Sequence, residues 1–348
     1  MNKVTLILPS HIHHLCQITA GFLLLRRQGW EVEIRDQSRD AADPYHDMPI
    51  AFAEYRGQRI AYDVWDGYQN PPTMRQAAQE CDFYFKRSFD ARRNESCFGE
   101  DAGKIYPLGF NYHVTLPGSP TNEPLWKQLL KPLLGRAPDV YFTPEVFAGE
   151  ARPQEGTSPR ILFLTRLWED DPQLDEETNR ERQEINRSRI QLIRTLQSRY
   201  GERFLGGLND LPIARQLAPD LIVPAKLTER KHYMRLLHES DICIGTMGLH
   251  ESIGWKTGEY VAAAKAIVNE RMHYQVTGDF AEGKNYLSFT TAQECLDAVE
   301  RLVQDPQARY EMQKANQCYY AQYLRPEALV ANTLKKVDEI LEKRQNQA

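Results

Sequence analysis

Hydrophobic and polar positions alternate in short blocks along the chain, and these blocks predict strands alternating with helices. Residues 3–9 form a short apolar run that is typical of a buried strand. Residues 16–29 carry apolar positions at helical spacing and end at a glycine, which favours a helix stop. Another short apolar run follows at residues 31–34. This order of strand, helix and strand predicts a parallel sheet.

The pattern then changes from helical spacing to two β-rich runs. These runs lie within residues 50–67 and meet at Arg56 and Gly57, which predicts a hairpin. Further expected elements of this half are a helix at 74–81 and strands at 82–89 and 104–112. The tyrosines and tryptophan of residues 62–68 predict an aromatic core cluster whose two aspartates face solvent, and the alternative is a role in binding a carbohydrate acceptor.

A polar stretch without periodicity, residues 148–159, predicts a linker between two domains. After it the alternation restarts, with expected strands at 160–168, 203–208, 242–247, 266–270 and 286–289 and expected helices at 180–201, 229–241, 254–265 and 292–304. The expected organisation is therefore an N-terminal domain at 1–150, a C-terminal domain at 151–325 and a closing helix at 326–348. Both domains are expected to be α/β.

Composition and charge narrow the class of protein. The 348 residues are 26% charged and 41% hydrophobic, as in ordinary globular proteins. The net charge of -5 argues against a nucleic-acid partner, which usually meets a basic surface. The six cysteines form no CxxC pair, so reduced cysteines in a cytoplasmic protein are expected. The first apolar run is too short for a signal peptide.

The stretch from Leu249 to Val268 carries the main candidate chemistry. It places Glu251, Gly254, Lys256 and Glu259 in and after the loop that joins a buried strand to a helix. Such loops lie at the carboxyl edge of a parallel sheet, where α/β proteins bind ligands. A helix N-terminus attracts phosphate, and Lys256 adds a positive charge there. The alternative is a solvated Lys–Glu helix face beside an acidic loop residue.

The position of Glu259 suits a sugar ligand. It lies three residues beyond Lys256, so both side chains project to nearly the same face of the helix. A carboxylate at this position can accept two hydroxyl groups of a ribose, and each such bond contributes roughly 1.5–3 kcal/mol. Glu251, earlier in the loop, could reach another sugar.

This stretch resembles the signature of nucleotide-sugar glycosyltransferases of the GT-B fold, particularly the retaining group. In that group two glutamates separated by seven residues bracket a Gly-rich turn, as Glu251 and Glu259 do here. The resemblance implies two Rossmann-like domains facing a central cleft, with the donor in the C-terminal domain and the acceptor in the N-terminal one. It also implies that the donor-binding residues are Ser252, Ile253, Gly254, Trp255, Thr257 and Glu259.

Residues with a catalytic role are implied in the same way. Glu251 would contact the donor sugar. Arg166, at the end of the strand after the linker, occupies the place of the family's diphosphate-binding arginine. The family often has a lysine a few residues later, whereas acidic residues follow here, and Lys256 is expected to supply that charge. The alternative for Arg166 is a surface ion pair with Glu169 or Asp170.

The sequence also departs from the family pattern. Ser252 replaces the first glycine, and Ala264 and Ala266 replace the later glycine and proline. Lys256 has no counterpart in the usual pattern of the family. These differences indicate a divergent branch of the family.

The histidines of residues 10–14 follow the first predicted strand. Of His11, His13 and His14, His13 is the one that we expect to face the ligand. The alternatives are a metal ligand and a plain loop residue. Arg187 and Arg189, in a charged run, are expected to lie on a solvated helix face, and the alternative is that one of them reaches the cleft. Residues 124–136 carry an apolar stripe, for which core packing is favoured over contact with an anionic membrane.

The resemblance therefore implies a glycosyltransferase of the hexosyltransferase type, acting in polysaccharide biosynthesis. It would move a sugar from a UDP- or GDP-linked donor to a glycan, lipid-linked or protein acceptor, with retention. Inversion, with a His or Asp as general base, is the mechanistic alternative. No cofactor or metal is expected. The expected location is cytoplasmic, with a peripheral site at the inner membrane face as a variant. A nucleotide-sugar epimerase and a non-catalytic scaffold are the functional alternatives.

Overall fold

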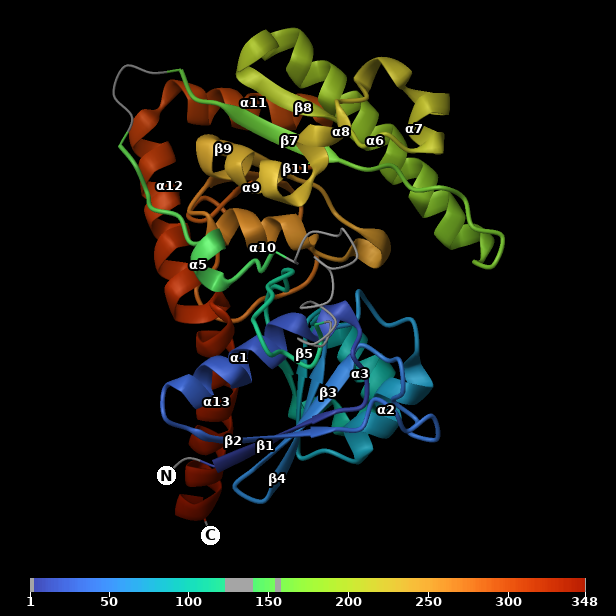
Figure 1. Cartoon of the computed structure of the whole chain (residues 1–348), viewed down its shortest axis with the longest axis vertical. Helices are drawn as coiled ribbons and strands as arrows, with labels where there is room; N and C mark the ends of the chain where they lie inside the picture. The colour runs from blue at the N-terminus through green and yellow to red at the C-terminus, as the bar shows by residue number, and fades with distance from the viewer. Residues whose placement is uncertain (1–2, 123–139, 154–157, 348) are drawn as a thin grey trace, which may run out of the picture. The chain divides into compact units, whose positions relative to one another are not determined.

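The computed structural model describes residues 3–122, 140–153 and 158–347 and consists of two compact units (Figure 1). Unit 1 comprises Met1–Val146, Tyr274–Gly278 and Ala321–Ala348. Unit 2 comprises Phe147–His273 and Asp279–Tyr320. The chain thus contributes two later segments to the unit that its first part forms.

Unit 1 is built around a six-stranded sheet with the order β2-β1-β3-β4-β5-β6. The strands are β1 (Lys3–Leu8), β2 (Glu31–Asp36), β3 (Ile50–Tyr55), β4 (Gln58–Asp63), β5 (Phe83–Lys86) and β6 (Ile105–Pro107). The predicted parallel pair β1–β2 and the predicted hairpin β3–β4 are confirmed. Arg56 and Gly57 form the hairpin turn with φ angles of 50° and 74°, as a tight two-residue loop requires. The strand expected at 104–112 is shorter than predicted.

Helices cover both faces of this sheet. They are α1 (Cys16–Arg27), α2 (Pro71–Gln79), α3 (Ala91–Phe98) and α13 (Pro326–Gln347). On one face Phe22 of α1 and Leu334 of α13 join Leu6 of β1 in a single apolar cluster. A Cβ at Gly21 of α1 would lie 2.4 Å from the carbonyl oxygen of Pro326. Only glycine therefore lets α1 and α13 approach so closely.

A fully buried ion pair occupies the interior of unit 1. Lys86 Nζ lies 2.7 Å from Asp63 Oδ2, and neither side chain is exposed. The lysine also donates to the carbonyl oxygen of Gly67, and the hydroxyl of Tyr84 donates to Asp63. The expectation that the aspartates of residues 62–68 face solvent is therefore wrong for Asp63. Its partner lies on the neighbouring strand, which the local sequence does not reveal.

Unit 2 is built around a five-stranded parallel sheet with the order β11-β10-β9-β7-β8. The strands are β7 (Ile161–Thr165), β8 (Phe204–Leu208), β9 (Ile242–Gly245), β10 (Ala266–Glu270) and β11 (Leu287–Phe289). The helices are α6 (Glu176–Tyr200), α7 (Pro212–Leu217), α8 (Ala225–Thr228), α9 (Arg230–Glu239), α10 (Trp255–Ala262), α11 (Ala292–Gln304) and α12 (Pro306–Tyr319), and α5 (Pro144–Phe147) lies where the two units meet in the sequence.

Packing in unit 2 follows the alternation of the strands. Ile161 of β7 and Ile244 of β9 point to the face covered by α6 and α11, where they join Leu192 and Val299. The predicted α/β class, with a Rossmann-like parallel arrangement of strands and helices, is confirmed by these sheets. The apolar stripe at 124–136 lies outside the described residues.

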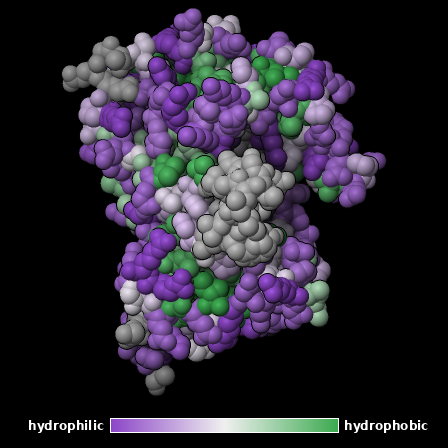
Figure 2. All heavy atoms as spheres, viewed as in Figure 1, coloured by the Kyte–Doolittle hydropathy of each residue, from purple (hydrophilic) through white to green (hydrophobic). Residues whose placement is uncertain are grey.

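The outer surface is mostly hydrophilic on the face shown in Figure 2. Within the described ranges, the exposed large hydrophobic side chains are Val140, Val146, Leu174 and Leu217. None of the helices in these ranges is long and apolar enough to cross a membrane.

Candidate active site

The candidate site lies at the carboxyl edge of the unit 2 sheet, where the strand order reverses. The chain runs from β7 to its neighbour β8 and then returns to the other side of β7 as β9. Strand β7 ends at Thr165 and β9 ends at Gly245. Open α/β sheets bind ligands outside such a switch point, because the connecting loops leave it in opposite directions. Arg166 and the loop before α10 follow these two neighbouring strands.

The N-terminus of α10 offers backbone N–H groups to a ligand. The helix begins at Trp255, which is half-buried, and Gly254 is its N-cap residue. Gly254 has no side chain that could cap this end, and the first turn contains no acidic residue. A Cβ at Gly254 would lie 3.2 Å from the carbonyl oxygen of Thr246, so glycine eases a close approach of the loop. The N–H groups of a helix N-terminus and the helix dipole favour a bound anion.

Lys256 adds a full positive charge in the first turn of this helix. Its amine donates to the carbonyl oxygen of Leu164 in β7 and lies 4.9 Å from the ring centroid of Tyr233. Burial lowers the pKa of Lys256 to about 8, although the charge of Glu259 acts in the opposite direction. The lysine is thus mostly cationic at pH 7, in a position where a charge is costly without an anionic partner.

Glu259 is buried beside this charge, with only 2% of the residue exposed. Its Oε1 atom lies 2.8 Å from the Nη1 atom of Arg230, the first residue of α9. Its Oε2 atom is buried and has no hydrogen-bond partner. Buried carboxylate oxygens are almost always bonded, so an unmatched one indicates a missing donor. Two hydroxyl groups of a ligand could supply this missing hydrogen-bond donor.

Glu251 lies in the loop, half-exposed. Both His250 and Glu251 have φ angles of 59°, which non-glycine residues seldom adopt. The His250 N–H donates to Glu181 Oε1 of α6 at 2.6 Å, and Glu251 Oε1 lies 3.7 Å from His273 Nδ1. These contacts hold the loop in a strained conformation, and such strain is common at functional sites.

The other residues that are expected to bind the sugar donor are buried in the loop and in the first turn of α10. Ser252 and Ile253 are 3% and 6% exposed. Thr257 is fully buried, and its hydroxyl donates to Asn269 Oδ1 at 2.9 Å. A Cβ at Gly245 would lie 1.9 Å from that same oxygen, so the end of β9 requires glycine. The side chain of Thr257 therefore fastens α10 to β10, while its backbone belongs to the first turn of the helix.

Arg166 follows β7 and is largely exposed. Its guanidinium carbon lies 4.1 Å from the ring centroid of Trp168. Partial burial, and then the nearby charge of Arg182, lowers the pKa of Arg166. The alternative of an ion pair with Glu169 or Asp170 does not occur in the part of the chain that the structure describes. Arg166 and the α10 end thus provide positive charge on two adjacent loops.

Arg189 of α6 is a site residue that sequence analysis places on a solvated helix face, with the cleft only as an alternative. It is 7% exposed, so its expected place on a solvated face is wrong. Its guanidinium donates to the carbonyl oxygens of Arg166, at 2.8 Å, and Met247, at 3.2 Å. It therefore ties together the loops that follow β7 and β9. Burial lowers the pKa of Arg189 to about 10, with Glu270 opposing the shift. In the sequence, the only indication that Arg189 is buried is its helical spacing from Leu192 and Leu196, which lie on the core face of α6.

His13 belongs to unit 1, unlike the other predicted site residues. It opens a short turn, His13–Leu15, between β1 and α1 and is exposed. Its ring centroid lies 4.3 Å from that of His14 and 6.2 Å from that of His113. Burial lowers the pKa of His13, and burial followed by the charge of His13 lowers the pKa of His14 to about 4. His14 is therefore neutral at pH 7.

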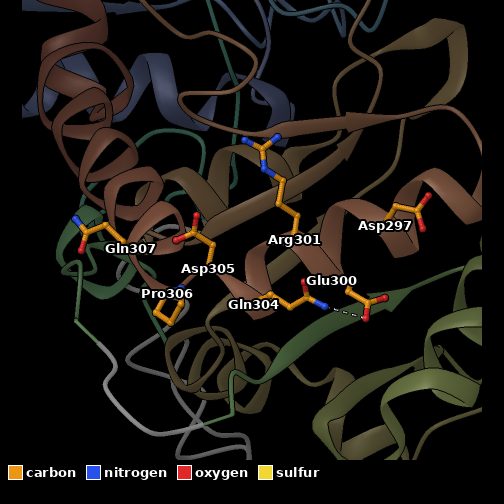
Figure 3. A pocket seen from close by; sticks show the side chains of 7 residues that line it. All are labelled: Asp297, Glu300, Arg301, Gln304, Asp305, Pro306 and Gln307. Carbon is orange, nitrogen blue, oxygen red and sulfur yellow. Dashed lines mark hydrogen bonds between the residues drawn. The ribbon is translucent and has the colours of Figure 1, made fainter.

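Two further observations concern other ligands. Over the described ranges, no group of three or more His, Cys, Asp or Glu side chains is arranged to hold a metal ion. A surface pocket lies where α11 meets α12 (Figure 3). It is lined by Asp297, Glu300, Arg301, Gln304, Asp305, Pro306 and Gln307. None of these is a predicted site residue, and Gln304 already donates to Glu300 at 3.2 Å.

Replacing Lys256 by methionine is expected to stabilise the unliganded protein while weakening anion binding. The folded-state pKa of about 8 lies below the ordinary value of 10.5, so the unfolded chain binds more protons between these values. The buried charge therefore costs stability below pH 8, and the cost fades as the pH rises to 10.5. Removing the charge should relieve a cost of about 3 kcal/mol, and losing the hydrogen bond to Leu164 should cost about 1 kcal/mol. The variant should therefore be more stable than wild type by about 2 kcal/mol at pH 7.

Urea unfolding of wild type and Lys256→Met at pH 7 and pH 10.5 measures this difference. The gain should be present at pH 7 and largely absent at pH 10.5. Equal stabilities at pH 7 would contradict the buried cation.

Comparison with known proteins gives matches only at the level of structure. No family model matches the sequence, and no curated protein matches it. Among solved structures, the Anabaena protein HepE in complex with UDP is 12% identical, with 99% of this chain and 100% of that chain covered and a TM-score of 0.46. A glycosyltransferase from Rickettsia africae is 14% identical, with 98% and 99% covered and a TM-score of 0.44.

A third solved structure is also similar. A protein described as a UDP-N-acetylglucosamine 2-epimerase from Listeria monocytogenes is 14% identical, with 77% of this chain and 62% of that chain covered and a TM-score of 0.37. At such low identities and TM-scores, these likenesses do not decide the activity.

Proposed function

We propose that this protein is a glycosyltransferase that takes a sugar from a UDP- or GDP-linked donor. The observation that carries the proposal is Glu259, whose buried Oε2 atom has no hydrogen-bond partner among the described residues and lies in the helix whose first turn carries Lys256. A ribose supplies hydroxyl donors for the carboxylate, and a diphosphate supplies negative charge for the helix end. A nucleoside diphosphate joins these two groups at the required separation of about one helical turn, about 5 Å.

The charges of the site suit departure of a diphosphate. The α10 N–H groups, Lys256 and Arg166 would stabilise the negative charge that develops on the diphosphate as its bond to the anomeric carbon breaks. Such stabilisation acts on the transition state more than on the bound donor, and so it accelerates transfer. Glu251, in its strained loop, would bind hydroxyl groups of the donor sugar.

Transfer with retention is the mechanism that we propose. The acceptor oxygen forms a bond to the anomeric carbon on the face that the diphosphate leaves, and the acceptor proton passes to a phosphate oxygen. This route needs neither a metal nor a protein nucleophile. His13 is proposed to orient the acceptor hydroxyl group. For the acceptor we propose only a class, which is a glycan, a lipid-linked glycan or a protein.

A thermal-shift panel with UDP, GDP, uridine, guanosine and the corresponding sugar nucleotides tests this function. One diphosphate series should stabilise the protein, by about 2.7 kcal/mol at one hundred times its dissociation constant, and the bare nucleoside should have little effect. If no nucleotide changes the melting temperature, the proposal is wrong. If the bound sugar nucleotide is isomerised without any acceptor, the protein is an epimerase instead.

A further inference from the structure

Two arginines from different elements lie against one tryptophan beside the candidate site. Arg166 follows β7, and Arg182 lies in the second turn of the long helix α6, which Figure 1 labels. Their guanidinium carbons lie 4.1 Å and 5.5 Å from the ring centroid of Trp168. Two positive charges are therefore held close together at the carboxyl end of β7, where the ring attracts both.

Neither arginine is neutralised by a carboxylate. Within the ranges that the structure describes, neither guanidinium forms an ion pair. Arg182 Nη1 donates to the carbonyl oxygen of Glu169 at 2.8 Å, whereas its Nε atom is buried without a partner. The indole Nε1 of Trp168 is likewise buried and unbonded. Paired positive charges with unused buried donors indicate that an anion belongs here.

The two arginines are held in place by the rest of α6. Asn186, one turn beyond Arg182, accepts from the backbone N–H of Trp168 at 2.8 Å and donates to its carbonyl oxygen at 2.7 Å. Arg189, one turn further, donates to the carbonyl oxygen of Arg166 at 2.8 Å. The loop that carries Arg166 and Trp168 is thus fixed against the helix that carries Arg182. A preorganised pair of this kind loses little entropy when it binds a ligand.

We propose that Arg182 and Arg166 together bind the distal phosphate of the donor diphosphate. This inference rests on the proposed function and adds Arg182 to the site. Guanidinium groups bind phosphate oxygens with two parallel hydrogen bonds, which suits them to a terminal phosphate. The end of α10 and Glu259 hold the proximal phosphate and the ribose. Arg182 therefore serves the part of the ligand that distinguishes a diphosphate from a monophosphate.

Titration calorimetry with UMP and UDP, and with GMP and GDP, tests the assignment. In Arg182→Met, the affinity for the diphosphate should fall at least about tenfold, while the affinity for the monophosphate should stay within about twofold of wild type. Arg182→Lys, which retains the charge, should recover part of the preference for the diphosphate. The matched control is Arg187→Met, because Arg187 lies on the same helix, is exposed and faces Glu184 at 3.9 Å. That variant should bind both nucleotides like wild type.

Each other outcome overturns the inference. If Arg182→Met binds the diphosphate like wild type, Arg182 does not contact it. If the variant loses mono- and diphosphate equally, Arg182 supports the fold of the site and not the distal phosphate. If wild type binds none of the nucleotides, the proposed function itself fails, and the inference fails with it. Failure of the inference alone leaves the wild-type affinities intact.

Discussion

Replacing Glu259 by alanine is expected to weaken binding of UDP or GDP by about 3 kcal/mol, or about 150-fold, if two hydroxyl bonds to a charged group are lost. The effect should be large because Oε2 is buried and no described residue of the protein bonds to it. Arg230, which pairs with Oε1, has a side chain that is 30% exposed, so water can solvate it in the variant. The loss of affinity should therefore exceed the loss of stability. Titration calorimetry and urea unfolding measure the two quantities separately.

The affinity for a deoxynucleotide shows whether the ribose hydroxyl groups are the missing hydrogen-bond donors to Glu259. Wild type should bind UDP or GDP at least about tenfold more tightly than the 2′-deoxy or 3′-deoxy analogue. In Glu259→Ala the two affinities should become nearly equal, because the removed carboxylate can no longer distinguish them. Glu259→Gln, which can retain an oxygen facing Arg230, separates the role of the carboxylate from that of the ion pair. A deoxy analogue that binds as tightly as the ribonucleotide in wild type would contradict the ribose assignment.

Replacing Lys86 by methionine is expected to destabilise the protein by about 3–5 kcal/mol, because Asp63 is then left as a buried charge without its cation. Both side chains are fully buried, and Asp63 retains only the hydroxyl of Tyr84 and the backbone N–H of Trp65. Methionine fills a similar volume, so the lost charge and not a cavity dominates the change. Urea and thermal unfolding measure the loss.

Two controls separate this effect from general damage. The double variant Asp63→Asn, Lys86→Met removes both charges and should recover part of the stability. Lys104→Met breaks the partly exposed pair with Asp101, where the two charged atoms are 2.8 Å apart, and should change stability by less than about 1 kcal/mol. A loss of similar size in both single variants would contradict a special role for the buried pair.

Much of the fold could be predicted from local patterns. The strand-to-helix connection from β9 to α10 follows from a short apolar run, a glycine and a small-residue helix. The β3–β4 hairpin follows from two β-rich runs around Arg56 and Gly57. Local rules succeed here because neighbouring residues decide the conformation.

Other features could not be predicted because they depend on packing between distant segments. Arg182 and Arg189 belong to a run of charged residues whose local pattern predicts a solvated helix face. Arg182 bonds to the loop after β7, and Arg189 bonds to the loops after β7 and β9, only because α6 passes those loops. Arg230 reaches Glu259 from another helix, and the spacing of the two in the sequence does not predict that contact. An arginine has the same local pattern whether it is solvated or buried against backbone carbonyls.

The long helix α6 gives the candidate site its shape. Asn186 and Arg189 hold the loop after β7, whereas Arg189 and Glu181 hold the loop after β9. Rigid support of this kind positions binding groups more accurately than mobile loops do. The site therefore depends on a helix for whose charged residues sequence analysis favours a solvated face.

A crystal structure of the complex with UDP or GDP tests the central claim most directly. The account predicts a ribose hydroxyl group within about 3 Å of Glu259 Oε2 and a phosphate at the N–H groups of the first turn of α10. A nucleotide bound elsewhere on the chain, or a ribose that leaves Oε2 without a partner, would contradict it.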